Sequence, residues 1–190
     1  MTNLLSAVLG FSFSAGLNTY ATVFALGVLD RLGVVHLPPT LHVVSTTPVL
    51  VAAAFLYLVE FVADKIPWFD SLWDGLHTLI RPAAGALLAY GVVGNVDPQW
   101  QVIAALAGGS IALTAHAAKA STRAAVNVTP EPFSNWLLSL GEDALSFLVV
   151  WLTATHPLIG ITIALVLILA AALIVWKLSQ FARRVFRKAS

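Results

Sequence analysis

Charged residues in this sequence recur at three- and four-residue steps beside long apolar runs. The stretch "HAAKASTR" follows the run "WQVIAALAGGSIALTA" and places His116, Lys119 and Arg123 on one face of a helix. A charge that faces lipid at mid-helix costs roughly 2.5–3.5 kcal/mol on insertion scales. These groups must therefore pair with acids, face water or extend to the membrane surface.

Other stretches repeat this pattern with acidic residues. Glu60 lies about 10 Å along its helix from Pro67, so it is well away from the helix end. Lys119 lies similarly far inside its own helix and has the opposite charge. We expect them either to form an ion pair or to line a polar cavity that binds a small ion or a lipid headgroup. The candidate cavity residues are Glu60, Asp64, Asp70, Asp74, His77, Arg81, His116, Lys119, Arg123, Asn135, Glu142 and Asp143.

Two further interpretations concern this set. Asp64, Arg81 and Arg123 lie near helix ends, where they could serve only as interfacial anchors. His77 and His116 belong to a residue type that titrates near neutrality, although a histidine on a packed helix is more often simply hydrogen-bonded. The charges therefore indicate either a functional cavity or packing between helices.

A different polar stretch, "SFSAGLNTYATV", lies near the N-terminus. Ser14, Gly16 and Asn18 interrupt an otherwise apolar helix. Broken helices expose backbone groups to substrates in transporters, whereas small residues also let helices approach closely. We favour close packing and keep the break as the alternative.

The elements that must position these residues are membrane helices. The chain has 190 residues, of which 59% are hydrophobic and 10% charged, against roughly 25% charged in soluble domains. A helix needs about 20 mostly apolar residues to span a bilayer. We expect one all-α polytopic transmembrane bundle over 1–178 and a basic cytoplasmic tail over 179–190. About six spans are expected, over 6–29, 48–65, 82–96, 99–124, 136–154 and 157–177.

Two features organise these spans. The segment 66–81, which ends just before the last residue of the stretch "PWFDSLWDGLHTLIRP", is expected to be a short amphipathic helix that is interfacial or re-entrant. Segments 48–96 and 99–154 share a layout of span, Pro-aromatic turn and span, which favours a parallel internal repeat. The alternative is that any helical hairpin has this layout.

Charge predicts the orientation. With six spans and the N-terminus inside, nine of the ten Lys and Arg residues are cytoplasmic, and only Arg31 is outside. Both termini are then cytoplasmic.

Four blocks resemble a bacterial integral-membrane family catalogued as domain of unknown function 4126. They are "SAGLNTYATVFALGVLDRLG", "EFVADKIPWFDSLWDGLHTLIRPAAGALLA", "HAAKASTRAAVN" and "PFSNWLLSLGED". The resemblance covers roughly 4–155 and implies a multi-pass protein of the bacterial inner (plasma) membrane. It implies no activity, substrate or catalytic residue.

The sequence favours a small transporter or channel with an inward-facing charged cavity. The alternatives are a flippase or scramblase for lipids or polyprenyl phosphates, and a structural or assembly protein whose charges form packing ion pairs. We expect no enzyme, cofactor or metal, because the sequence lacks cysteine and the common catalytic motifs. We expect no nucleic-acid partner, because the net charge is only +1. A membrane hydrolase stays open, since Asp70, Asp74 and His77 have ligand-like spacing. Small residues in three helices favour a homodimer.

Overall fold

Proline marks the start of the long helices in the computed structural model, which describes residues 1–127 and 132–189. From α3 to α7, each helix has proline at its first or second position, where a fixed φ and a missing N–H fit the first turn. All elements of the described part are helical, so the predicted all-α fold is confirmed. They are α1 (Thr2–Leu17), α2 (Thr19–Arg31), the 3₁₀ helix η1 (Pro39–Ser45), α3 (Thr47–Ala63), α4 (Pro67–Val92), α5 (Pro98–Val126), α6 (Pro132–Thr155) and α7 (Pro157–Ala189).

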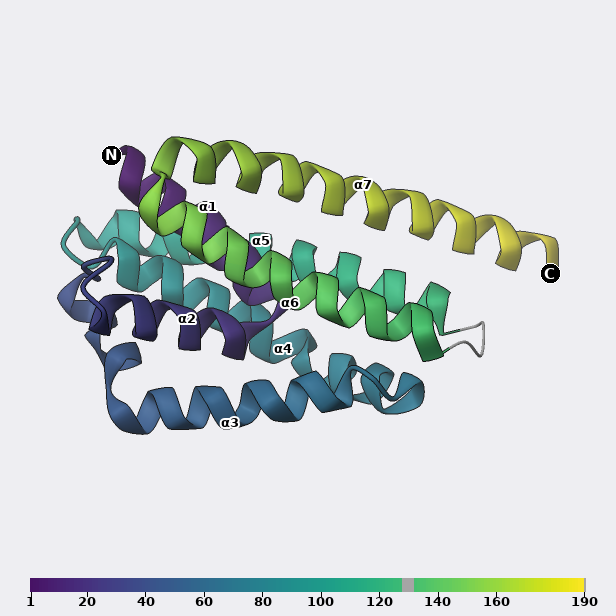
Figure 1. Ribbon diagram of the computed structural model, residues 1–190. Coiled ribbons are helices and arrows are strands. Elements are labelled where there is room, and N and C mark those ends of the chain that lie inside the picture. Colours follow the sequence, from purple (N-terminus) through teal and green to yellow (C-terminus); the bar gives the residue numbers. More distant parts are fainter. Residues whose placement is uncertain (128–131, 190) are drawn as a thin grey trace.

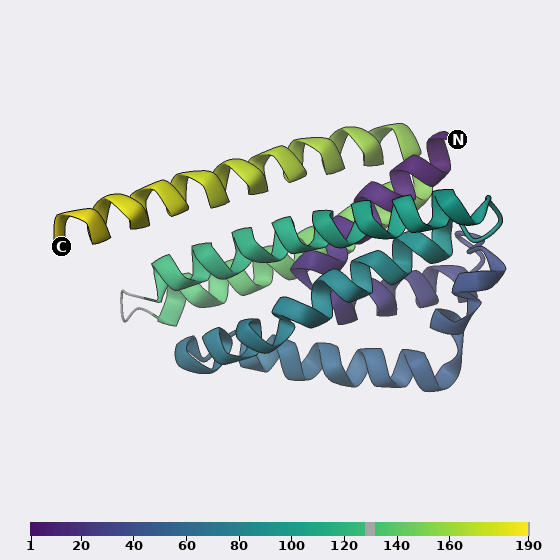
Figure 2. The ribbon, with the colours of Figure 1, turned by 180° about the vertical axis from the view of Figure 1, so that it is seen from behind.

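The first two helices form a hairpin that enters the bundle and turns back at Asn18 (Figures 1 and 2). Asn18 has an extended backbone, with φ −148° and ψ 101°, and its side-chain oxygen accepts a hydrogen bond from the Ala21 N–H at 2.9 Å. Phe11 of α1 and Leu26 of α2 pack in one apolar cluster, so the parts of the two helices that are remote from Asn18 lie side by side. The predicted single span over 6–29 is therefore wrong, because the chain reverses at the polar break.

Helix α1 lies at the centre of the molecule, with α4, α5, α6 and α7 packed around it. Every residue from Gly10 to Leu17 is buried. A Cβ placed on Gly16 would overlap the carbonyl oxygen of Ala112 and lie 2.7 Å from the Cβ of Ala115. The close packing predicted for this stretch is confirmed, and it occurs together with the break.

The polar segment that begins at Pro67 is the first half of a longer helix. α4 continues through Pro82 to Val92 as one helix of 26 residues, so 66–81 and 82–96 are not separate elements. Asp70 and Arg81 are fully buried, which shows that the polar face of this half points into the bundle. The expectation of a separate short helix is therefore wrong, and whether its N-terminal half is interfacial or re-entrant stays a prediction.

The bundle exposes apolar side chains and buries charged ones. On α3, the exposed residues Val51, Phe55, Leu58 and Val62 recur at helical spacing, whereas Glu60 on the same helix is fully buried. Soluble domains show the reverse distribution. This distribution is that of a helical protein in lipid.

Three helices are long and apolar enough to cross a membrane, over Pro98–Val126, Phe133–Thr155 and Pro157–Phe181. The pair Pro39–Ser45 and Thr47–Ala63, bent by 60°, adds a fourth if it is counted as one span. The prediction of about six spans is not confirmed.

The chain termini lie at opposite ends of the bundle (Figure 1). The reversal at Asn18 brings the chain back to the end where it started, so one predicted crossing is lost. The path therefore does not support termini on the same side of a membrane. The basic tail expected from residue 179 onward continues α7 as far as Ala189.

The two segments that predict a repeat are both helical hairpins. α3–α4 and α5–α6 run through the bundle in the same order of directions (Figures 1 and 2). α4 packs most extensively against α5, whereas α3 packs against α2 and α6 against α1. The layout agrees with a parallel repeat, and internal symmetry stays a prediction.

Candidate functional site

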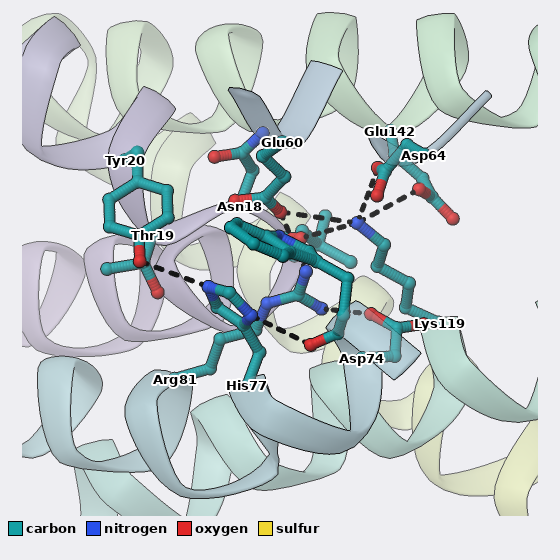
Figure 3. Close-up of polar contacts among 12 residues, drawn as sticks. Asn18, Thr19, Tyr20, Glu60, Asp64, Asp74, His77, Arg81, Lys119 and Glu142 are labelled. Carbon is teal, nitrogen blue, oxygen red and sulfur yellow. Dashed lines mark hydrogen bonds and ion pairs between the residues drawn. The ribbon is translucent and has the colours of Figure 1, made fainter. Parts of the chain in front are cut away.

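Four helices bring the predicted charged residues into one buried cluster, which we call the charged network (Figure 3). α3 and α4 supply most of the acids, α5 supplies two bases, and α6 supplies one acid. The charged network consists of Glu60, Asp64, Asp70, Asp74, Arg81, Lys119, Arg123 and Glu142.

Arg81 connects α4 to α3 and α5. Its guanidinium donates to Glu60 Oε1 at 2.7 Å and lies 3.1 Å from Asp74 Oδ1. It also donates to Nδ1 of His116 at 2.7 Å. Because an arginine has only donors, Nδ1 of His116 must accept, and the other ring nitrogen carries the proton toward Thr78 Oγ1 at 3.1 Å. His116 is therefore neutral and adds no positive charge.

Lys119 lies among three carboxylates, as Figure 3 shows. Its Nζ is 2.9 Å from Asp64 Oδ2, 3.4 Å from Glu142 Oε2 and 3.5 Å from Glu60 Oε1. It also donates to the carbonyl of Leu17, the last residue of α1, at 3.3 Å. The predicted pairing of Lys119 with Glu60 and Asp64 is present, and it holds the end of α1 as well.

Arg123 is one turn further along α5 and is equally buried. It donates to Asp64 Oδ2 at 2.9 Å and Asp70 Oδ1 at 2.9 Å, and it forms a close ion pair with Glu142. It also donates to the Asp64 carbonyl at 2.8 Å. The interpretation of Arg123, Arg81 and Asp64 as interfacial anchors is wrong, because all three are at most 1% exposed.

The tip of the α1–α2 hairpin reaches the edge of the charged network. Asn18 donates from Nδ2 to Asp143 Oδ1 at 2.9 Å. Ser14 and Thr22, on opposite sides of the break, join their hydroxyls at 2.6 Å. The polar stretch therefore stabilises a turn deep inside the protein, where irregular backbone needs internal partners.

In the part of the chain that the structure describes, pockets border the charged network at three places. A pocket of about 250 Å³ lies beside Asp74 and Arg123, and one of about 430 Å³ lies beside Glu142. A third, of about 160 Å³, touches Lys119 and Glu142 next to α7. Glu142 is the most accessible acid in the network, with 12% of its side chain exposed.

Two predicted residues lie apart from the charged pairs. His77 hydrogen-bonds to the Trp73 carbonyl at 2.8 Å and to the Tyr20 hydroxyl at 3.1 Å. Asn135 is 1% exposed, and neither side-chain polar atom has a hydrogen-bond partner. Among the described residues, no group of three His, Asp or Glu side chains is arranged to hold a metal ion, so Asp70, Asp74 and His77 do not converge.

A family model matches residues 5–177, nearly the whole chain, and its description is "Domain of unknown function (DUF4126)". The chain belongs to this family. The resemblance carried by the four sequence blocks is thus confirmed. No curated protein and no solved structure matches the chain.

Within this DUF4126 protein, the acids and bases of the charged network do not balance. Among the described residues, five carboxylates contact three basic side chains, which leaves two negative charges in excess when all are ionised. Buried oxygens without a hydrogen-bond partner occur on Glu60 (Oε2), Asp64 (Oδ1) and Asp143 (Oδ2). Buried charge that is not compensated costs several kcal/mol, so these carboxylates have capacity to bind protons or cations.

Sequence reasoning missed two partners of the site. Tyr20 and the Leu17 carbonyl both come from the hairpin tip, and they reach His77 and Lys119 only because α2 folds back. The available signal in the sequence was the polar stretch around Asn18. It indicates that the helix is interrupted, but it does not indicate that the chain then turns back.

Proposed function

We propose that this chain is a small membrane transporter or channel that moves protons or small monovalent cations through the charged network. The observation that carries the proposal is the surplus of buried carboxylates over bases, with a neutral His116 that offers no compensation. A buried site with excess negative charge gains stability when it binds a proton or cation. Such binding is the loading step of a transport cycle.

The hairpin supports the same proposal. Discontinuous helices place free backbone groups near binding sites in many transporters. Here the C-terminal end of α1 points its Leu17 carbonyl at Lys119, and Asn18 contacts a carboxylate. A backbone reversal at this depth is stable only inside protein or beside a polar path.

We further propose that the network opens toward the cytoplasm of a bacterial inner membrane. Five of the ten basic residues lie in 177–190, at the C-terminal end of the bundle. Lys119 and Arg123 are buried in ion pairs, so they are left out when the positive-inside rule is applied to the loops. In this orientation the N-terminus lies on the opposite side.

Lipid transport is less well supported, because the basic groups are already engaged. Arg81, Lys119 and Arg123 each contact at least two carboxylates. A phosphate headgroup would have to displace these acids, all of which are buried or nearly so. No described contact therefore favours the flippase or scramblase alternative.

A structural role is the second candidate, and the dense pairing favours it. Each base joins at least two helices, so the network could act only to hold α3, α4, α5 and α6 together. In that role the network stabilises the fold and carries nothing.

Reconstitution in liposomes separates these two candidates. The protein is placed in vesicles with an internal pH-sensitive dye, and proton, Na⁺ and K⁺ fluxes are measured under an imposed membrane potential. Lys119→Met is compared with the double variant Lys119→Met/Glu60→Gln, and Lys177→Met serves as the control outside the network. The coupling between two residues in contact is typically about 0.5–3 kcal/mol, so the double variant should recover part of the lost stability.

The transporter proposal expects wild-type flux above that of empty vesicles. It also expects this flux to be lost in the double variant while the fold survives. Restored stability with unchanged flux in every variant would favour the structural role instead.

A further inference from the structure

We infer that Asp143 on α6 is the proton-binding group of this transporter and that the buried polar face of α6 is the route by which the proton reaches it. The inference rests on the proposed function and specifies its substrate and site. It comes from a carboxylate that differs from all those in the charged network.

Asp143 has no basic partner among the described residues. Its one hydrogen bond comes from the neutral amide of Asn18 at 2.9 Å, and the residue is 5% exposed. Each acid of the charged network contacts at least one base within 4 Å. Protonating Asp143 therefore breaks no ion pair, whereas protonating a network acid does.

Asn18 determines which oxygen of Asp143 accepts the proton. The Asn18 Oδ1 is occupied by the Ala21 N–H at 2.9 Å, so the Nδ2 end must face Asp143. Nδ2 donates to Asp143 Oδ1, and Oδ2 is buried without a partner. A proton on Oδ2 converts the carboxylate to a carboxylic acid and leaves Oδ1 as an acceptor for Asn18.

The route to this oxygen is a line of polar groups on one face of α6. Asn135, Ser139, Asp143 and Ser146 follow each other at steps of four, four and three residues, and all are at most 5% exposed. Both polar atoms of Asn135 and the Ser146 hydroxyl have no hydrogen-bond partner. From Asn135 to Asp143 the rise is about 12 Å.

A row of buried polar groups in which Asn135, Ser146 and one oxygen of Asp143 have no hydrogen-bond partner is suited to a chain of hydrogen-bonded water. Buried water typically makes about three hydrogen bonds to such groups. Lys65 lies beside the row, with its Nζ 3.4 Å from Ser139 Oγ, and places a positive charge along the route. A proton can pass by exchange along such a chain of water and hydroxyl groups.

The charges around Asp143 come from α5 and from α3 with the turn that follows it. Lys119 of α5 favours its ionised form, whereas Glu60 of α3 and Asp64, directly after α3, oppose it. Tyr57 of α3 and Lys65, in the turn after α3, also interact with it electrostatically. Its proton occupancy is thus coupled to that of the charged network.

Protonation has a mechanical consequence at the hairpin. A hydrogen bond to a carboxylate is roughly twice as strong as one to a neutral group. Loading Asp143 therefore weakens its bond from Asn18, which tethers the tip of the α1–α2 hairpin. Proton binding and movement of the hairpin are linked in this way.

The test measures proton binding and proton flux separately. Wild type, Asp143→Asn and the control Asp97→Asn are reconstituted, and proton uptake is driven by a membrane potential. Asp97 is an exposed acid at the start of α5, so the control makes the same chemical change outside the site. In parallel, infrared difference spectra over a pH titration follow the stretching band of protonated carboxyl groups, and circular dichroism checks the fold.

The inference expects Asp143→Asn to lower proton flux by about 100-fold or more, the scale of losing a positioned proton-transfer group. It also expects one carboxyl band to disappear in this variant and to persist in Asp97→Asn. Wild-type flux in a folded Asp143→Asn variant would overturn the inference and leave the proposed function standing. Absence of ion flux in the wild type would overturn the proposed function. The infrared titration would then decide the inference alone, and an unchanged spectrum in Asp143→Asn would overturn it.

Discussion

The apolar cluster around Phe11, Leu26 and Leu88 contains no ionisable side chain, whereas the charged network beyond the tip of the hairpin buries seven of its eight ionisable side chains, all but Glu142. Helices α4, α5 and α6 contribute to both regions. On α5, for example, Ala104 belongs to the apolar cluster and Lys119 to the charged network. Each of these three helices thus has an apolar end and a charged end.

The two regions should therefore differ in how their stability depends on pH. Apolar side chains between helices in a membrane are held by van der Waals packing, because lipid is as apolar as they are, and this packing does not depend on pH. A buried ion pair contributes only while both partners are charged, since removing one partner leaves an uncompensated charge. We therefore expect the two regions to react differently to mutation and to pH.

The largest effect is expected from Arg123→Met, which leaves Asp70 without a basic partner among the described residues and leaves Asp64 and Glu142 with Lys119 alone. Breaking a buried ion pair in this way costs about 3–5 kcal/mol. The unfolding free energy in detergent should fall by that amount, and Arg183→Met in the exposed part of α7 should leave it unchanged. A loss below about 1 kcal/mol would mean that the network behaves like surface charge, and the contrast between the two regions would disappear.

A smaller effect is expected from Gly16→Val, which tests packing without charge. The added side chain overlaps the Ala112 carbonyl of α5, and overpacking typically costs about 1–3 kcal/mol. This loss should be the same at every pH where the protein is folded. Gly141→Ala, where a Cβ meets nothing within 4 Å, is the matched control and should be neutral or slightly stabilising. A pH-dependent loss in Gly16→Val would show that packing and charge are not separate.

The smallest effect is expected at Asp30, an acid at the end of α2 and outside the helices that qualify as spans. Partial burial raises the pKa of Asp30, but hydrogen bonds from the Leu37 N–H at 3.0 Å and the Ser45 hydroxyl outweigh it, so the net pKa lies below 3.8. A depressed carboxylate pKa stabilises the fold above 3.8, and this stabilisation is lost as pH falls through the lower folded value.

Asp30→Asn should therefore cost about 1 kcal/mol at neutral pH. The difference in unfolding free energy between Asp30→Asn and wild type should disappear as the pH falls well below 3.8. Urea titrations at several pH values measure this difference. If the difference in unfolding free energy stays constant down to acid pH, the stabilisation by Asp30 does not depend on its charge. The loop around Asp30 would then be as insensitive to pH as the apolar cluster.

The pairing of deep charges could be predicted from the sequence. Lys119 and Glu60 stand too far from their helix ends to reach water, so each needs a partner of opposite charge, and the structure joins them at 3.5 Å. Arg123 could not be assigned in the same way. It lies near the end of α5, and only the packing of α4 and α6 over it decides that it is buried among three acids.

The reversal at Asn18 was decided by the tertiary structure alone. The uncharged run over 1–29 is long enough to cross a bilayer, so length and hydropathy favour a span. A turn inside the protein becomes stable only when its free polar groups find partners, and those partners are Lys119 for the Leu17 carbonyl and Asp143 for Asn18. The sequence by itself determined that this is a helical membrane protein with charges in need of partners. The fold decided which groups meet, because the partners lie about a hundred residues or more away along the chain.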